Sequence, residues 1–176
     1  KRGSDRPFII ADMPFGSYQE APEQAFRNAV TLMAAGAQMV KLEGGLGMAK
    51  TVEFLVHRGI PVCGHVGLLP QSVHVLGGYR VQGKTPVAAA ALLEDVRALT
   101  EAGVAMLVVE CVPSAVGEAL SRAASVPVIG IGAGASCSGQ VLVIYDALGI
   151  QPGRAARFVR NFMAGRDGIE AAISAY

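Results

Sequence analysis

Four apolar runs of this chain each end on a polar or charged residue. The runs are FIIAD, MVKLE, PVCGH and MLVVE, and they end at Asp12, Glu43, His65 and Glu110. A carboxylate at the end of an apolar run is costly to bury without a partner. Because the carboxyl ends of parallel strands meet at one edge of a sheet, the pattern predicts strand ends that converge on a metal or a polar substrate.

A repeated plan surrounds these runs. Each repeat has a helix tail, a glycine or small residue, a short connection and an apolar strand, as in AAGAQMVKLEGG, HRGIPVCGHVG, EAGVAMLVVEC and AASVPVIGIGAG. The alternation of strand and helix predicts right-handed crossovers and a parallel sheet. The runs lack period-2 alternation, which is typical of strands covered on both faces.

The pattern predicts one α/β domain over residues 1–176, including C-terminal helices within 152–176. Expected strands are 8–12, 38–43, 61–66, 105–110 and 127–132, and 140–146 is either a sixth strand or the start of a helix. Expected helices are 22–36, 85–103, 114–125, 152–164 and 167–175. A (β/α)8 barrel takes about 250 residues, so a chain of 176 residues is expected to form an incomplete barrel.

Composition excludes several classes of protein. The net charge is +1 and no basic stretch occurs, so binding to nucleic acid or to a membrane surface through bulk charge is not expected. No apolar run is long enough for a membrane span, and the polar start KRGSDRP does not resemble a signal peptide. Cys63, Cys111 and Cys137 lack a Cys-x-x-Cys spacing and are expected to be reduced thiols of a cytoplasmic protein.

Lys41 and Glu43 are spaced i, i+2, so both side chains lie on one face of their strand. Two charges inside a barrel are costly as structure alone, although a structural Lys–Glu ion pair is the alternative. Asp12 is a candidate ligand, or a residue that accepts loop amides. Glu110 follows an apolar run and is a candidate general base, or else it pairs with Lys41.

Carboxylates without a histidine or thiol cluster favour magnesium over zinc, iron or copper. His65 stands alone at its strand end, where a hydrogen-bonded structural residue is the more common role. Magnesium near a lysine polarises a carbonyl, so these residues predict metal-assisted enolisation. Two glycine-containing segments remain open. Residues 130–140 cradle an anion or only permit a tight turn, and 77–85 form a loop over the site or a subunit contact.

At these residues the chain resembles the ketopantoate hydroxymethyltransferase family, whose members are 3-methyl-2-oxobutanoate hydroxymethyltransferases. The resemblance runs in family order through ADMPFGSY, AGAQMVKLEGG, GIPVCGHVGLLPQSVHVLGGYRVQGKT, VVECVP, VPVIGIGAG, SGQVLVIYDALG and RFVRNFMAG. It implies a (β/α)8 TIM barrel of the phosphoenolpyruvate mutase-like group, here lacking the first two strands. It further implies magnesium-dependent transfer of a hydroxymethyl group from 5,10-methylenetetrahydrofolate to 3-methyl-2-oxobutanoate, giving 2-dehydropantoate for pantothenate biosynthesis.

The resemblance also implies roles for particular residues. Asp12 matches a metal ligand that lies against the substrate, and Glu43 matches a second metal-site carboxylate. Lys41 matches a substrate-binding lysine, and Glu110 matches the proton acceptor. Partners implied are the 2-oxo acid, the folate and further copies of the chain in a ring-like homo-oligomer.

One departure from the family pattern stands out. Members carry two further strands and a Gly-Asp-Ser motif with another metal-ligand aspartate, and this sequence contains no Gly-Asp-Ser. We expect the chain to be a fragment or the ordered part of a longer one; the alternative is that another chain supplies the strands. Two other readings of function stay open: a lyase or mutase acting on another 2-oxo acid, and a catalytically incomplete fragment.

Overall fold

The computed structural model describes residues 6–176. They form two compact units, the first ending at Gly139 and the second spanning Gln140–Tyr176. Within the described residues no helix has both the length and the apolar character needed to cross a membrane.

A parallel sheet organises the first unit. Its strands lie side by side in chain order. Strands β1 and β6 are the two edge strands, and no other described strand pairs with their outer edges. The predicted strands are thereby confirmed, each within two residues of its expected bounds. The six strands are β1 (Ile10–Asp12), β2 (Met39–Glu43), β3 (Val62–Gly67), β4 (Met106–Glu110), β5 (Val128–Ile131) and the two-residue β6 (Gly139–Gln140).

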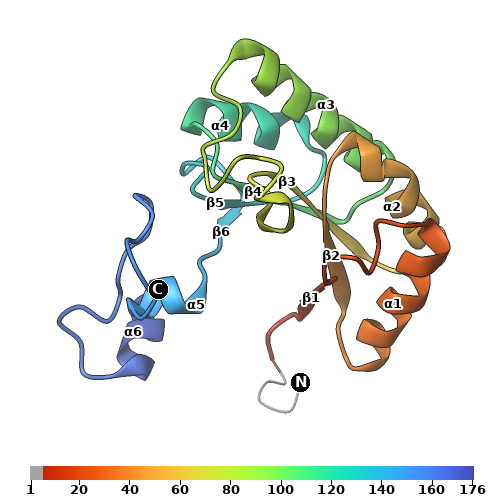
Figure 1. Cartoon of the computed structure of the whole chain (residues 1–176). Helices are drawn as coiled ribbons and strands as arrows, with labels where there is room; N and C mark the ends of the chain where they lie inside the picture. Colours follow the sequence, from red (N-terminus) through yellow and green to blue (C-terminus); the bar gives the residue numbers. More distant parts are fainter. Residues whose placement is uncertain (1–5) are drawn as a thin grey trace. The chain divides into compact units, whose positions relative to one another are not determined.

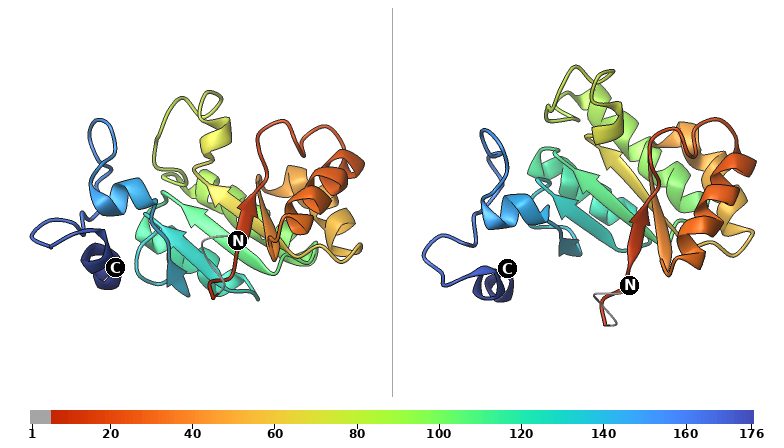
Figure 2. Two further views of the ribbon diagram at one scale, coloured as in Figure 1. Left: turned by 90° about the horizontal axis from the view of Figure 1, so that it is seen from below. Right: turned by 60° about the horizontal axis from the view of Figure 1, so that its bottom comes forward.

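Four helices cover one face of this sheet (Figure 1). They are α1 (Pro22–Ala34), α2 (Ala49–Val56), α3 (Pro86–Glu101) and α4 (Ser114–Ala123), with short 3₁₀ helices η1 (Leu46–Met48) and η2 (Pro70–Ser72) between them. Two further directions of view show the same layering (Figure 2). Prolines at the first positions of α1 and α3 have a backbone torsion suited to a helix start, and the Thr85 hydroxyl accepts a hydrogen bond from Ala88 N at 3.2 Å.

Strand register separates the two faces of the sheet. One face packs against the helices and contributes Val40, Leu42, Val62, Leu107 and Val109 to the buried core. The opposite, inner face belongs to the alternate residues of the same strands, of which Met106, Val108 and Ile129 are only half-buried. The predicted site residues belong to this inner face.

Two expectations about helices and strands need correction, and one helix was not expected. Residues 140–146 are neither a full strand nor a helix from their start, because β6 ends at Gln140 and α5 spans Ile144–Leu148. Residues 152–164 were expected to be helical and contain no helix, whereas α6 (Ile169–Ala175) confirms the last one. Helix α2 was not expected from the sequence. In 152–164 the Asn161 side chain accepts a hydrogen bond from Met163 N, a local bond that competes with helix formation.

Candidate active site at the carboxyl ends of the strands

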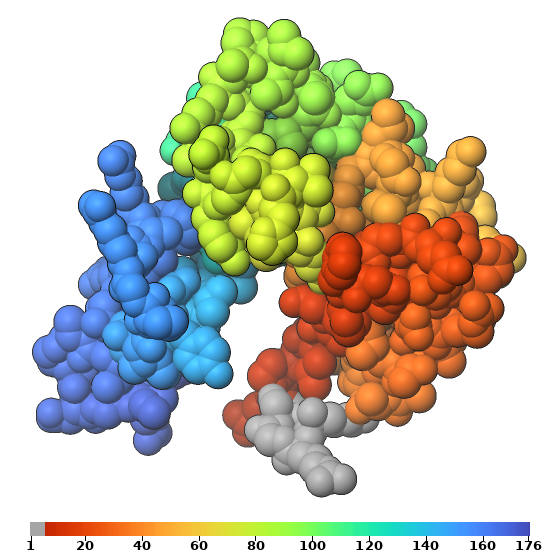
Figure 3. Space-filling view, in the orientation of Figure 1, coloured from red at the N-terminus to blue at the C-terminus, as the bar shows by residue number. Residues whose placement is uncertain are grey.

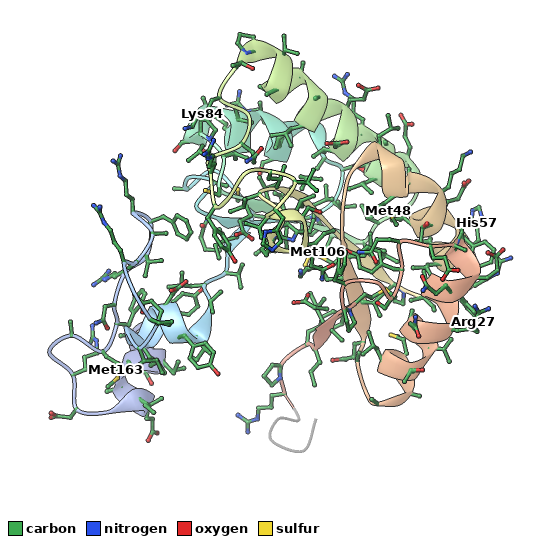
Figure 4. The ribbon with its side chains drawn as sticks, viewed as in Figure 1. Arg27, Met48, His57, Lys84, Met106 and Met163 are labelled. Carbon is green, nitrogen blue, oxygen red and sulfur yellow. The ribbon has the colours of Figure 1, made fainter. Side chains whose placement is uncertain are left out.

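Register places all four predicted residues on the inner face, at the carboxyl ends of neighbouring strands. Asp12 pairs with Lys41 in register, and Glu43 lies two residues beyond Lys41 on the same face. Glu43 in turn pairs with His65. Glu110 shares its face of β4 with Met106, which Figure 4 labels, whereas Arg27 and His57 belong to the helical layer.

Asp12 and Lys41 form an ion pair, with 2.9 Å between Lys41 Nζ and Asp12 Oδ1. The Lys41 side chain is 17% exposed and that of Asp12 is 65% exposed. A pair this open to water contributes little to stability. Within residues 6–176 the lysine forms no ion pair with Glu43 or Glu110, so both purely structural pairings considered above are wrong.

His65 lies between the two glutamates. Its Nδ1 is 3.6 Å from Glu43 Oε1, and its Nε2 is 3.2 Å from Glu110 Oε2. The first distance is too long for a hydrogen bond, and neither ring nitrogen has a hydrogen-bond partner among the described residues, so both are contacts between a ring nitrogen and a carboxylate oxygen. Burial lowers the pKa of His65, but the carboxylates of Glu110 and Glu43 together outweigh burial, and the net pKa lies above its ordinary value.

A closed set of hydrogen bonds fixes Glu43. Gln71 N donates to Glu43 Oε2 at 2.9 Å, and Glu43 N donates to the Tyr18 hydroxyl at 3.1 Å. The hydroxyl donates to Gln71 Oε1 at 2.6 Å, and Gln71 Nε2 donates to Met13 O at 2.9 Å. These bonds join the loop after β1 to the segment after β3, and Figure 3 shows the two segments, in red and in yellow, side by side on the surface.

The backbone at Glu110 is held closely as well. Leu68 N donates to Glu110 O at 2.8 Å. A Cβ at Gly67 would lie 2.2 Å from that same oxygen, so only glycine fits there. Cys111, the next residue, has φ of 52°, and no other described residue except glycine has a positive φ. Strained backbone of this kind is concentrated at functional sites, and it supports a functional role for this strand end.

Sequence reasoning missed Tyr18 and Gln71 and assigned no functional role to His65. Both missed residues follow strand ends, in ADMPFGSY and in HVGLLPQS. Only 1% of Tyr18 is exposed, and burial raises the pKa of its hydroxyl. The available signal was a tyrosine in a short loop beside a strand end, because a buried tyrosine hydroxyl needs a hydrogen-bond partner.

The described residues contain no group of three or more His, Cys, Asp or Glu side chains arranged to hold a metal ion. Magnesium is nevertheless commonly held by one or two carboxylates, with water and substrate oxygens completing its octahedron. Asp12 and Glu43 supply two carboxylates on adjacent strands and one face. This donor set fits magnesium and gives little support to zinc, which prefers histidine and cysteine.

The two glycine-containing segments, 130–140 and 77–85, contact different parts of the molecule. Within 130–140, the Ser138 hydroxyl accepts a hydrogen bond from Val128 N. Part of that segment and part of α4 line a cavity of about 430 Å³, whose lining residues include none of the predicted site residues. Within 77–85, Gln82 N donates to Cys111 O at 2.9 Å, which brings this loop next to Glu110. Anion binding by the first segment stays a prediction.

Comparison with known proteins identifies relatives over the whole chain. A family model described as ketopantoate hydroxymethyltransferase matches residues 1–176. A Nitrosomonas eutropha protein named 3-methyl-2-oxobutanoate hydroxymethyltransferase is 63% identical over 176 residues, which are 100% of this chain and 65% of that protein. An Azoarcus protein of the same name is 63% identical over 99% of this chain and 65% of its own length. The chain therefore spans slightly less than two thirds of these relatives.

A solved structure has the same fold. The crystal structure, assigned as a phosphonomutase from Burkholderia cenocepacia J2315, matches with a TM-score of 0.54 and 21% identity. The match covers 73% of this chain and 56% of that chain. At this identity the likeness shows the fold alone, and the described parallel sheet with its helices forms part of the expected barrel.

Proposed function

Because this chain belongs to the ketopantoate hydroxymethyltransferase family, we propose that it serves the magnesium-dependent transfer of a hydroxymethyl group from 5,10-methylenetetrahydrofolate to 3-methyl-2-oxobutanoate. The product is 2-dehydropantoate, on the route to pantothenate. The observation that carries the proposal is the convergence of Asp12, Lys41, Glu43 and Glu110 on one sheet face. In this proposal they supply two metal ligands, a substrate-binding cation and a base.

Each residue has a distinct task in this proposal. Asp12 and Glu43 hold the magnesium ion, and Asp12 also lies against the 2-oxo acid. Lys41, whose ammonium group forms an ion pair with Asp12, binds the substrate carboxylate. When bound, magnesium supplies the polarisation of the keto oxygen that makes the neighbouring C–H acidic.

Glu110 is the general base. It takes the proton from C3 of the oxo acid, and the electron pair of that C–H bond moves toward the keto oxygen. The nucleophilic C3 then forms a bond to the one-carbon unit of the folate, and water supplies the hydroxyl oxygen on the same carbon. Both carbon–nitrogen bonds of that unit break, and the two nitrogens of the departing tetrahydrofolate take the proton from Glu110 and the proton that water loses. The tight hold on the Glu110 backbone supports this task, since a base must be placed within hydrogen-bond reach of its proton.

The first half of the reaction gives a direct test. In D2O with magnesium, the protein should exchange the C3 hydrogen of 3-methyl-2-oxobutanoate for deuterium, as followed by proton NMR. Glu110→Gln should slow exchange by about 100-fold or more, because a positioned base contributes that much. Glu118→Gln, a surface glutamate paired with Arg122, should leave the rate unchanged. No exchange by the unmodified protein, or equal rates in both variants, would contradict the proposal.

Two wider expectations belong with this function. We infer that the protein is cytoplasmic, as expected of a metabolic enzyme that works on free folate. We also infer a ring-like homo-oligomer. Both stay predictions.

A further inference from the structure

We propose that His65 is a positioning residue, which fixes the direction of the Glu110 carboxylate by joining it to the immobilised carboxylate of Glu43. The inference rests on the proposed function, because it assigns His65 a role toward the base of that reaction. It adds a residue to which the sequence pattern gave no role.

Among the described residues, His65 is the one ion-pair partner of the Glu110 carboxylate. Its Nε2 lies 3.2 Å from Glu110 Oε2. The Glu110 side chain is 17% exposed. Leu68 N holds the Glu110 backbone, and the imidazole contacts its carboxylate, so the imidazole is the group that sets the direction of that carboxylate.

The imidazole can do this because it is itself immobile. Its side chain is 3% exposed and lies on β3, the strand between those of the two glutamates. On its other side Nδ1 meets Glu43 Oε1 at 3.6 Å. One orientation of the ring lets its two nitrogens contact both glutamates, and rotation about the side-chain bonds of His65 would break both contacts.

Glu43 supplies the fixed end of this chain of contacts. Its Oε2 accepts from Gln71 N, and its own N–H donates to the buried Tyr18 hydroxyl, which is bonded to the Gln71 side chain. The hydrogen bonds of Tyr18 and Gln71 therefore fix Glu43, the contact with Glu43 orients His65, and the contact with His65 orients the carboxylate of the base. A base displaced by about 1 Å can lose on the order of 100-fold in rate.

Three substitutions separate positioning from packing. In His65→Gln the amide nitrogen reaches about as far as Nε2 and keeps a donor for Glu110, whereas in His65→Asn it reaches only as far as Nδ1, toward Glu43. Tyr18→Phe keeps the ring and removes the hydroxyl at the other end of the chain. All three are compared with the unmodified protein by circular dichroism and thermal unfolding before kinetics.

The decisive readout is the rate constant for C3 deuterium exchange, separated from the KM for the oxo acid. We expect His65→Asn to lower the rate constant by about 100-fold with KM within about twofold, since only the placement of the base changes. His65→Gln should recover at least about tenfold of this loss, and Tyr18→Phe should lower the rate constant by a smaller factor. Equal rates for the Asn and Gln variants, or a loss seen only in KM, overturns the proposal.

A second readout keeps the inference testable if the unmodified protein does not exchange deuterium, which would contradict the proposed function instead. The 13C resonance of the Glu110 carboxyl, assigned with Glu110→Gln, should be sharp and distinct from that of the exposed Glu118. His65→Asn should move it to the position of exposed glutamates, and His65→Gln should not. A resonance that is unchanged in both His65 variants overturns the positioning role.

Discussion

Cys63 is a fully buried thiol on the inner face, paired in register with Lys41 on one side and Met106 on the other. Burial raises its pKa to about 12, against the opposing influence of Lys41. A thiol held neutral in this way is a poor nucleophile. The residue is therefore a packing residue beside the site and has no role in the proposed chemistry.

This raised pKa predicts how stability depends on pH. Below pH 9, the ordinary value for this thiol, both folded and unfolded chains keep it protonated and it adds no pH dependence. Above that value the unfolded chain ionises first, so stability is lost as the pH rises toward about 12. Guanidinium unfolding at pH 8, 9 and 10 should show a steeper loss in the unmodified protein than in Cys63→Ala. Parallel curves would contradict the prediction.

Among the elements, β3 has the central place. All six of its residues are buried, and it pairs with both β2 and β4. Its end at Gly67 turns with φ of +95° directly beside the Glu110 carbonyl. The strand that places His65 between the glutamates therefore needs a glycine at the point where the chain leaves it.

Replacing that glycine should cost more than strain alone. Gly67→Ala adds both an unfavourable torsion and a clash 2.2 Å from Glu110 O, whereas Gly59→Ala adds only the torsion, with φ of +81° and open space around the new Cβ. We expect a loss of about 1 kcal/mol in the free energy of unfolding for Gly59→Ala. For Gly67→Ala we expect about 2 kcal/mol or more beyond that, because the backbone must shift.

Urea denaturation of both variants measures this difference. Equal losses would mean that the turn after β3 relaxes freely, and would remove the argument that the strand end is held in one geometry. A loss of C3 exchange in Gly67→Ala at a temperature where it is folded would link the same geometry to Glu110.

At the scale of the whole molecule, the main buried core belongs to the first compact unit. Every member of that core lies between Met13 and Ala133. In the second unit only Ala147, Leu148 and Ala172 are buried apolar residues. A unit with so little buried surface has little to oppose local opening.

Amide hydrogen exchange followed by mass spectrometry should show this contrast. Peptides covering β3 and β4 should exchange slowest, because their ladders are buried under α2 and α3. Peptides from 150–168 should exchange fastest of the described residues, since no helix or strand is found there, and α6 should be intermediate. Comparable protection of 150–168 and β3 would contradict the prediction.

The extent of sequence-based prediction differs between elements. Strands β1 to β5 were predictable because each is a short apolar run, preceded in β2 to β5 by a helix tail and a glycine or small residue, and α1 and α3 because their prolines and apolar spacing mark helices. The failure at 152–164 has a physical cause. A short helix depends on packing of an apolar face, and Phe158 in this segment is 40% exposed.

The sequence by itself determined which residues share the inner face, because side chains alternate along a strand and parallel strands end at one edge. That rule places Asp12, Lys41, Glu43 and Glu110 together without any knowledge of their partners. Only the tertiary structure decided the pairing: Lys41 with Asp12, His65 between the glutamates, and Gln71 and Tyr18 on Glu43. The physical reason is that partners are chosen by distance across neighbouring strands and loops, and residues as far apart in the chain as Tyr18 and Gln71 meet only when the sheet has formed.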